Sequence, residues 1–523
     1  MTFTGELRRY QEQAKALITQ RERALLALDL GTGKTIVSIA AIEELREAGK
    51  IKCALLIMSS SLTKQWEQKI QEFTDSSVRI VDGSTLPKKR LSIYEEILSA
   101  PPDYMIMGLR QAVSDMPFIQ KLNPDLVLVD EVTNIKNFGT QQTKAIKKIK
   151  SRYRIGLTAE PVENGKAEEL FSIMQWIDDS VLGNWREFES NYITRNSYNI
   201  ITGYKNMPEL NNRLMDACIS KRRTDPDVAE FMPTVEEYNC YVEMDDVTAK
   251  IYKQIARELY GELRSADPQA SRELASYYSG ERDSNIDSTG LGKITSRLLA
   301  CQLLLDDPSL LEASARAYND PENPMGSRYA SQLLEAGRLS PSGTHGAKLS
   351  ACVELVEEYM AADPEHKVIV FARFKGVLPL LRDRLSTYNP VLFTGDLNGK
   401  QRGEAIFRFT NDPDTRLFLS SDAGGYGVDL WCASHLLNYD LPNSSGAFKQ
   451  RNGRHVRASS KFRKVYIDNL IVSGSIEEYQ LTRLKYKARV ANAVLTGTSD
   501  VHGKVTNDAK SLTKFLENYL ENK

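Results

Sequence analysis

The segment LALDLGTGKTIVSIA (residues 26–40) constrains the fold more than any other part of the sequence. It places an apolar, strand-like run before a glycine-containing loop, a Lys-Thr pair and a helical pattern. Gly31 and Gly33, with Thr32 between them, would let the loop turn its backbone N–H groups towards phosphate oxygens. Lys34 would then reach the outer phosphates, and Thr35 would ligate a magnesium ion. The segment therefore predicts a phosphate-binding loop, because a plain glycine turn gives no reason for Lys34 and Thr35.

The fold class follows from the alternation of strand-like and helical patterns. Apolar runs such as ALLAL, CALLIM, YMIM and LVLV alternate with helical patterns such as IVSIAAIEEL and LTKQWEQKIQEF. This alternation is typical of a parallel sheet covered by helices. The runs KVIVFARF, PVLFTG, RLFLSS and VYIDNLIV repeat the pattern later in the chain. We therefore expect an α/β protein with two parallel-sheet domains and a mainly helical insert between them.

A chain of 523 residues exceeds what one hydrophobic core usually serves. The patterns predict a first α/β domain over residues 1–178, a helical insert with a linker over 179–346, a second α/β domain over 347–495 and a helical tail over 496–523. DVTAKIYKQIARELYGEL and ITSRLLACQLLL carry the helical pattern of the insert. Its last part, residues 306–346, is broken by Pro, Gly and Ser, and it predicts a connector or mobile loop.

The composition excludes several classes of protein. The 68 Lys and Arg residues nearly balance the 69 Asp and Glu residues, so any contact with nucleic acid has to come from local patches. The six cysteines are scattered, without the C-x-x-C pairs of a typical zinc site. No export signal or membrane-length apolar run is present. We expect a cytoplasmic protein that has no membrane partner.

Two carboxylates follow an apolar strand in the segment PDLVLVDEVTNIKN. Asp130 would hold the magnesium shell, and Glu131 would polarise an attacking water molecule. A pair of strand-end charges facing solvent would give the same pattern. Together with the phosphate-binding loop, however, the pair favours the catalytic interpretation.

A basic segment near the end of the chain carries seven Lys and Arg residues between Lys449 and Lys464. A phosphoryl-transfer site gains from an arginine placed on the developing negative charge. Arg454 and Arg457 are three residues apart, and they would share one face of a helix if this segment is helical. A solvated basic face is the usual alternative for such a run. We expect the two arginines to act on a nucleotide, and their basic neighbours Lys461, Arg463 and Lys464 to face solvent or DNA phosphates.

Taken in order, the motifs resemble the Swi/Snf-like DNA translocases of helicase superfamily two. LRRYQ is similar to the Q motif of that family, LLIMSSSLTKQWEQKIQEF to motif Ia and DEVTNIKN to motif II. GLTAEPVENGKAEELFSIMQWI is similar to motif III and its continuation, and SKRRTDPDVAEFMPTVEE to the paired-arginine segment. LLACQLLLDDPSLL resembles the inter-lobe helix, LFLSSDAGGYGVDL motif V and QRNGRHVR motif VI.

The resemblance implies two RecA-like lobes with ATP between them and DNA lying across both. It implies ATP and Mg²⁺ as cofactors, duplex DNA as the preferred partner and a monomeric motor. The residues that it implies for ATP binding, beyond the loop, are Gln11, Gly427 and Asp429. Those that it implies for DNA contact are Ser60, Ser61, Thr158 and Ser421.

The chain also departs from the family pattern. Thr133 replaces the motif II histidine, Ala159 and Glu160 replace the Gly-Thr pair of motif III, and Asp422 stands where many relatives carry arginine in motif V. The I-G-Q sequence after motif VI is absent. These departures predict altered coupling of hydrolysis to the second lobe, with phosphate binding preserved. They also suggest a diverged, minimal member from a virus or mobile element.

The leading hypothesis is an ATP-driven motor on double-stranded DNA, which could remodel forks, branched DNA or protein–DNA complexes. A nucleotide-gated DNA-binding scaffold with weak turnover is an alternative, because of the changes at Thr133, Ala159 and Glu160. An RNA helicase is another alternative. A small-molecule kinase with a phosphate loop ranks low, since it would need neither a second sheet domain with Arg454 and Arg457 nor the ordered set of motifs.

Overall fold

The computed structural model describes residues 3–81, 85, 87–197, 199, 201–265, 274, 277–278, 292–320, 326–339, 344–422, 428–502 and 509–521. The chain forms two compact units, and each unit consists of two separate stretches of sequence. The first unit contains Met1–Met232 and Lys487–Gly503, and the second contains Pro233–Tyr486 and Lys504–Lys523. The sequence analysis divided the chain into four parts by where strand-like and helical patterns occur. That division stays a prediction.

The first unit is built on a seven-stranded sheet in which every strand pair is parallel, as the sequence predicts. In spatial order its strands are β3 (Val78–Val81), β4 (Tyr104–Gly108), β2 (Ala54–Met58), β5 (Leu126–Asp130), β6 (Tyr153–Thr158), β1 (Arg23–Leu28) and β9 (Cys218–Lys221). Strands β2, β4 and β5 are buried along their whole length. Burial on both faces explains why they read as continuous apolar runs.

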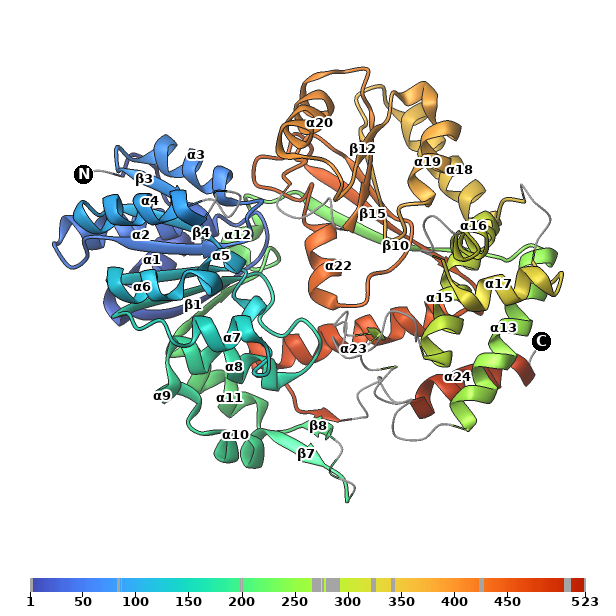
Figure 1. Cartoon of the computed structure of the whole chain (residues 1–523), viewed down its shortest axis with the longest axis horizontal. Helices are drawn as coiled ribbons and strands as arrows, with labels where there is room; N and C mark the ends of the chain where they lie inside the picture. The colour runs from blue at the N-terminus through green and yellow to red at the C-terminus, as the bar shows by residue number, and fades with distance from the viewer. Residues whose placement is uncertain are drawn as a thin grey trace. The chain divides into compact units, whose positions relative to one another are not determined.

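Helices and one small sheet complete the first unit (Figure 1). The helices are α1 (Arg9–Arg21), α2 (Lys34–Glu47), α3 (Thr63–Phe73), α4 (Pro87–Ser99), α5 (Leu109–Ser114), α6 (Met116–Leu122), the 3₁₀ helix η1 (Val132–Ile135), α7 (Gln141–Ile146), α8 (Ala167–Ile177), α9 (Asp179–Leu182), α10 (Trp185–Tyr192), α11 (Met207–Met215) and α12 (Pro226–Ala229). Helices α1, α2 and α3 pack their apolar side chains on the sheet in one core. The small sheet joins β7 (Ile193–Arg195), β8 (Ile201–Tyr204) and β16 (Val501–His502).

The second unit has a six-stranded parallel sheet. In spatial order its strands are β10 (Thr234–Val242), β15 (Lys464–Val472), β14 (His435–Asn438), β11 (Val368–Ala372), β13 (Leu417–Ser421) and β12 (Val391–Phe393). Strands β10 and β15 run side by side over nine residues (Figure 1). The two parallel sheets confirm the predicted α/β fold class.

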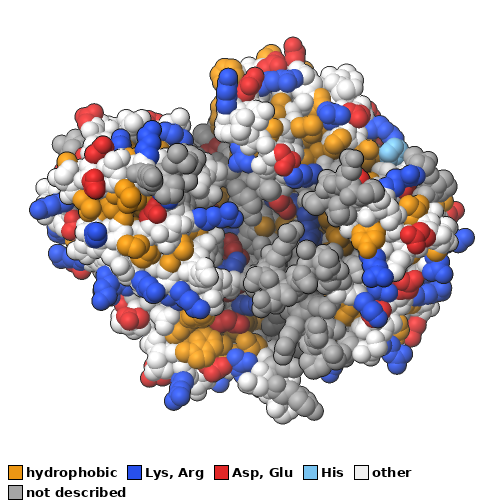
Figure 2. Space-filling model, in the orientation of Figure 1, with side chains coloured by type: hydrophobic (Ala, Val, Ile, Leu, Met, Phe, Trp, Pro, Cys, Tyr) orange, Lys and Arg blue, Asp and Glu red, His pale blue; other side chains and the backbone are white. Residues whose placement is uncertain are grey.

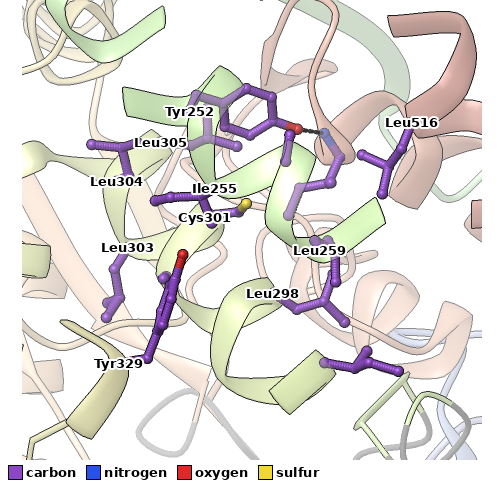
Figure 3. Packing of buried hydrophobic residues seen from close by; sticks show 14 of the residues in the cluster. Tyr252, Ile255, Leu259, Leu298, Cys301, Leu303, Leu304, Leu305, Tyr329 and Leu516 are labelled. Atoms are coloured by element: carbon purple, nitrogen blue, oxygen red, sulfur yellow. Dashed lines mark hydrogen bonds between the residues drawn. The ribbon is translucent and has the colours of Figure 1, made fainter. Parts of the chain in front are cut away.

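The helices of the second unit include a helical subdomain. They are α13 (Asp246–Arg264), α15 (Lys293–Asp306), α16 (Pro308–Tyr318), α17 (Arg328–Glu335), α18 (Ala347–Ala362), α19 (Val377–Arg384), the 3₁₀ helix η2 (Ser386–Tyr388), α20 (Gly399–Asn411), α22 (Ser445–Asn452) and α24 (Ala509–Glu521). Helices α13, α15, α17 and α24 share one apolar core around Tyr252 and Cys301 (Figure 3). The hydroxyl of Tyr252 accepts a hydrogen bond from the backbone N–H of Ile476 at 2.8 Å, which ties this core to the start of α23 (Ile476–Thr496).

The structure corrects one expectation about the insert. The segment predicted as a connector or mobile loop contains helices α16 and α17. Pro308 occupies the first turn of α16, where its missing N–H costs nothing, and the Asp307 side chain caps that helix by accepting from the N–H of Ser309. The insert is mainly helical, as predicted, and it also contributes β9 to the first sheet and β10 to the second.

None of the helices in the described part of the chain combines the length and the apolar character that a membrane crossing requires.

Candidate active site

The glycine-containing loop lies between β1 and α2, as the sequence predicts. Gly31 and Gly33 adopt positive φ angles of 79° and 93°, a backbone region that L residues with side chains rarely enter. A Cβ atom on Gly33 would lie 2.4 Å from the Gln11 amide nitrogen, so that a side chain has no room there. Helix α2 begins at Lys34, directly after the loop. The arrangement directs the positive end of a helix dipole and a set of loop N–H groups at one place, which suits an anion.

Lys34 folds back onto the backbone of the loop that it follows. Its ammonium group donates to the carbonyl oxygen of Leu28 at 2.8 Å and to that of Asp29 at 3.4 Å. Thr32 closes the loop by donating its hydroxyl to the same Asp29 carbonyl at 2.6 Å. The ammonium group is thus held beside the glycine loop by weak neutral acceptors, for which a phosphate would be a stronger replacement.

Gln11 braces the phosphate-binding loop from helix α1. Its amide nitrogen and the hydroxyl of Tyr10 both donate to the carbonyl oxygen of Thr32 at 2.9 Å. Its amide oxygen accepts from the backbone N–H of Arg8 at 2.8 Å, which caps the helix. Both side chains are buried. The sequence singled out Gln11 for adenine contact, which stays a prediction, and it did not predict that Tyr10 would share in the brace.

Asp130 lies at the carboxyl end of β5 and is buried. One carboxylate oxygen accepts from the Trp66 indole N–H at 2.9 Å, and the other accepts from the backbone N–H of Glu131 at 3.0 Å. Burial raises the pKa of Asp130, while Trp66 and the charge of Lys34 oppose that shift. Glu131 adopts a left-handed backbone conformation with φ 50°, which is uncommon for a residue with a side chain and is frequent at functional sites. The turn at Glu131 therefore ends the strand with two carboxylates at its tip.

The arginines of the second unit lie outside a helix, contrary to the expectation of a shared helical face. Helix α22 ends at Asn452, because Gly453 breaks it, and Arg454 and Arg457 follow in the next loop. Arg454 is 6% exposed, and its guanidinium donates to the carbonyl oxygen of Val428 at 3.5 Å. Arg457 forms an ion pair with Asp429 at 2.5 Å. Both arginines therefore lie against the segment that follows β13 in the sequence. Gly427, the other residue expected there, lies outside the described residues.

The sequence profile of the SNF2-related domain matches residues 10–301, and that of the helicase conserved C-terminal domain matches residues 347–459. The chain belongs to the SNF2-related family. This membership confirms the resemblance to Swi/Snf-like proteins of helicase superfamily two that the motifs predicted. The match covers the phosphate loop, Asp130 and Glu131 in the first profile, and Arg454 and Arg457 in the second.

Curated relatives agree with this assignment. A Bacillus subtilis protein named as an ATP-dependent helicase/translocase, YwqA, is 26% identical over 488 residues, which are 91% of this chain and 47% of that protein. Chromodomain-helicase-DNA-binding protein 8 of Danio rerio is 23% identical over 540 residues, which are 99% of this chain and 20% of that protein. The chain thus spans less than half of the length of both relatives.

A solved structure agrees with the fold. The helicase domain of Pyrococcus furiosus Hef matches with a TM-score of 0.53 and 14% identity, covering 92% of this chain and all of that domain. At this identity the likeness concerns the fold alone. It agrees with two lobes of the RecA-like type within one SNF2-related chain.

Residues that depart from the family pattern form defined hydrogen bonds in this SNF2-related chain. The hydroxyl of Thr133 donates to a carboxylate oxygen of Glu163 at 3.1 Å, and Lys136 pairs with the other oxygen at 2.5 Å. Thr133 therefore links the segment of Asp130 to the segment that follows β6. Glu160 donates its backbone N–H to the hydroxyl of Thr158 at 3.0 Å. The motif II and motif III segments are thus connected through Glu163 inside the first unit.

The residues expected to contact DNA fall into two groups. Ser60 and Ser61 are exposed just after β2, whereas Thr158 and Ser421 are buried at the ends of β6 and β13. Exposure supports the first pair as surface contacts, and the DNA contact of all four stays a prediction.

The flanking cations Lys461 and Lys464 are about half exposed and pair with Glu365 and Glu236. This exposure agrees with the solvent-facing role expected for them.

The residues at the tip of β5 and at the start of α2 suit a magnesium ion. The described residues contain no cluster of three or more His, Cys, Asp or Glu that could hold a metal by itself. A magnesium ion in a nucleotide site needs no such cluster, because it keeps several waters and binds through one or two protein oxygens and the substrate phosphates. The buried Asp130 carboxylate and the Thr35 hydroxyl are hard oxygen donors of the right kind. The donor set therefore fits Mg²⁺ bound together with a nucleotide.

The sequence missed Arg451, which proves to be the most deeply buried arginine of the motif VI segment. It is 3% exposed at the end of α22 and pairs with Asp422 and Asp440. One signal in the sequence pointed to Arg451. Asp422 stands where many relatives carry an arginine, and a carboxylate there needs a cation as its partner. The two residues are 29 positions apart, so that only the fold reveals the pair.

Proposed function

We propose that this chain is a DNA-dependent ATPase that couples ATP hydrolysis to movement along duplex DNA. The observation that carries the proposal is the presence, in one SNF2-related chain, of a phosphate loop with two carboxylates at the tip of β5 and of two arginines in the motif VI segment. The names of the relatives, helicase, translocase and DNA-binding protein, agree with it.

The residues of the first unit would bind and activate the nucleotide. The loop N–H groups and Lys34 would hold the phosphates, and Gln11 with Tyr10 would keep the loop in shape. Thr35 and Asp130 would hold a magnesium ion, which supplies charge neutralisation on the phosphate oxygens. Glu131 would orient and polarise the attacking water.

Arg454 and Arg457 would supply positive charge to the transferred phosphoryl group. The buried Nε of Arg457 has no hydrogen-bond partner within the described part of the chain. A buried donor without an acceptor is costly, and a phosphate oxygen would satisfy it. This supports Arg457 as a nucleotide ligand more directly than its position in the motif does.

The test is one steady-state ATPase measurement with duplex DNA, single-stranded DNA, forked DNA and RNA in parallel. The proposal expects the highest turnover with duplex or forked DNA. Stimulation by RNA alone would contradict it and favour an RNA helicase.

A nucleotide-gated DNA-binding scaffold with weak turnover is the second candidate. The specific observation behind it concerns Thr133, which stands where the family has a histidine. Its hydroxyl donates to Glu163 within the first unit. DNA binding that depends on ATP, together with turnover that DNA leaves unchanged, would favour this candidate. Location in the cytoplasm, a monomeric state and an origin in a virus or mobile element also stay predictions.

A further inference from the structure

The three arginines of the segment QRNGRHVR each contact the chain around the end of β13 and the segment after it. Arg451 pairs with Asp422, and Arg457 pairs with Asp429. Between them, Arg454 accepts from the backbone N–H of Leu430 at 3.0 Å through its carbonyl oxygen. The motif VI segment therefore contacts Asp422 through Arg451, Leu430 through Arg454 and Asp429 through Arg457. Only Arg451 among the three was not assigned to the nucleotide.

Arg451 differs from the other two arginines in its surroundings. Its Nε pairs with a carboxylate oxygen of Asp422 at 2.5 Å. Its two terminal nitrogens donate to Asp440, one to the backbone oxygen at 2.6 Å and one to the carboxylate at 3.1 Å. Two carboxylates thus face one guanidinium from two sides. These carboxylates raise the pKa of Arg451 further above its usual range, although burial alone would lower it.

The carboxylate of Asp440 is itself held by a residue that follows β11, the strand next to β14 in the sheet. Its second oxygen accepts from the backbone N–H of Arg373 at 2.6 Å, directly after β11. The guanidinium of Arg373 donates in turn to Gln302 of α15 at 2.8 Å. The position of Arg451 is therefore set by groups that come shortly after the ends of β11, β14 and β13.

We propose that Arg451 is a positioning residue, which uses Asp422 and Asp440 to fix the place of Arg454 and Arg457. The backbone carries the effect, because the N–H of Arg454 donates to the carbonyl oxygen of Arg451 at 3.1 Å across the end of α22. If Arg451 were released, the loop that carries both arginines would lose its anchor at the helix end. This inference rests on the proposed ATPase function.

The same arrangement accounts for the departure at Asp422. An arginine at this position, as many relatives have, would place a second positive charge against the buried guanidinium of Arg451. Like charges in a buried site repel strongly. Asp422 and Arg451 therefore belong together as a pair, and the departure at Asp422 maintains the motif VI loop in this chain.

The experiment compares four variants of the full chain. Asp422→Asn removes one of the two carboxylates that face Arg451, and Arg451→Gln removes the guanidinium. The double variant combines both changes. Asp396→Asn is the matched control, because it makes the same carboxylate-to-amide change in an exposed ion pair of the same unit, with Lys375. For each protein, kcat and KM for ATP at saturating duplex DNA, the melting temperature and amide hydrogen exchange of residues 428–430 and 452–457 are measured.

Asp422→Asn is expected to lower kcat about 10- to 100-fold, because a small misplacement of a charge-stabilising group is enough to do so. KM for ATP and the melting temperature should stay close to wild type, and exchange in the two segments should rise. The Asp396→Asn control should change none of these. Arg451→Gln leaves the buried carboxylate of Asp440 and the partly exposed carboxylate of Asp422 without their cation and should lower the melting temperature. The added Asp422→Asn change should recover part of that loss.

Unchanged kcat and exchange in Asp422→Asn would overturn the inference, and so would strictly additive effects in the double variant. If Arg451→Gln does not fold, the kcat and hydrogen exchange of Asp422→Asn alone still test whether Arg451 positions the loop. A wild-type chain without ATPase activity would instead contradict the proposed function, and the exchange data would still test the anchoring of the loop.

Discussion

At the scale of single residues, the site depends on side chains that hold backbone in unusual conformations. Gln11 and Tyr10 meet at one carbonyl of the glycine loop, and Glu131 ends β5 in a left-handed turn. Glycine adopts a positive φ without strain, whereas the left-handed turn at Glu131 costs on the order of 1–3 kcal/mol and persists only where the surroundings impose it. The strained turn supports the proposed role of Glu131 in catalysis.

Lys34→Ala is expected to abolish ATP turnover and leave the fold intact. The ammonium group is a point charge for phosphate, and the carbonyl oxygens of Leu28 and Asp29 that accept its hydrogen bonds can be hydrated by water instead. Turnover, binding of a fluorescent ATP analogue and the melting temperature check this. Turnover at the wild-type rate would contradict the assignment of the loop.

Glu131→Gln should separate binding from hydrolysis. The amide keeps the size of the side chain but cannot polarise water, so that ATP should bind normally and turn over at least about 100-fold more slowly. Equilibrium binding and single-turnover measurements check both parts. Loss of ATP binding would show that Glu131 has a different role.

Arg454→Ala and Arg457→Ala should lower turnover at saturating DNA by about 10³-fold or more, as expected for arginines that stabilise the transferred phosphoryl group. DNA affinity without nucleotide should stay nearly unchanged. The triple change of Lys461, Arg463 and Lys464 to Ala is the matched control, and it should weaken DNA binding or do nothing. Full turnover of the arginine variants at higher DNA concentration would show that these arginines grip DNA.

At the scale of elements, the sequence predicts the buried strands well and the polar ones poorly. Strands β2 and β5 read as apolar runs because both faces are covered, whereas β10 carries glutamates and tyrosines along an exposed edge and was missed. Helices α16 and α17 were taken for a connector, because Pro and Gly dominate the local signal while the packing that forms the helices is tertiary. The arginine loop after α22 was likewise misjudged, since a three-residue spacing fits a helix and a loop equally well.

A buried histidine makes the second sheet sensitive to acid. His435 on β14 lies between the rings of Tyr359 and Tyr466, with centroid distances of 4.1 and 4.7 Å, and near His366. Burial, with a smaller effect of His366, lowers the pKa of His435 from 6.5 to about 4. The unfolded chain therefore binds this proton first, and stability is lost as the pH falls from about 6.5 to 4. The loss from this residue should reach about 3 kcal/mol.

His435→Phe keeps a ring in the stack and removes the titration. Urea unfolding midpoints at pH 7 and pH 4.5 should differ less in this variant than in the wild type. An equal difference in both proteins would contradict the assignment of the acid sensitivity to His435.

At the scale of the whole molecule, balanced charge limits how the chain can hold DNA. The formal net charge is −1, and basic and acidic side chains are interspersed on the face shown in Figure 2. The proposed attraction to DNA would therefore have to come from a limited number of local phosphate contacts, whose positions the sequence does not reveal. Ser60 and Ser61 were predicted only through the family resemblance, since short hydroxyls at strand ends also serve ordinary turns.

Salt should weaken the stimulation of ATP turnover by duplex DNA. Each phosphate contact releases counterions, so that the logarithm of the DNA affinity should fall with the logarithm of salt with a slope of about −0.9 per contact. DNA titrations of the ATPase rate between 50 and 200 mM salt check this, with DNA-free turnover as the control. Stimulation that is independent of salt would exclude binding through phosphates.

The split of the first unit into two stretches of sequence has a consequence for its synthesis. Strand β16 completes the small sheet with β8, yet 296 residues separate Tyr204 from Val501, and the chain of the second unit lies mostly between them. At roughly 5–20 residues per second, β8 leaves the ribosome about 15–60 s before its partner strand is made. The first unit therefore stays without its last strand while most of the second unit is translated.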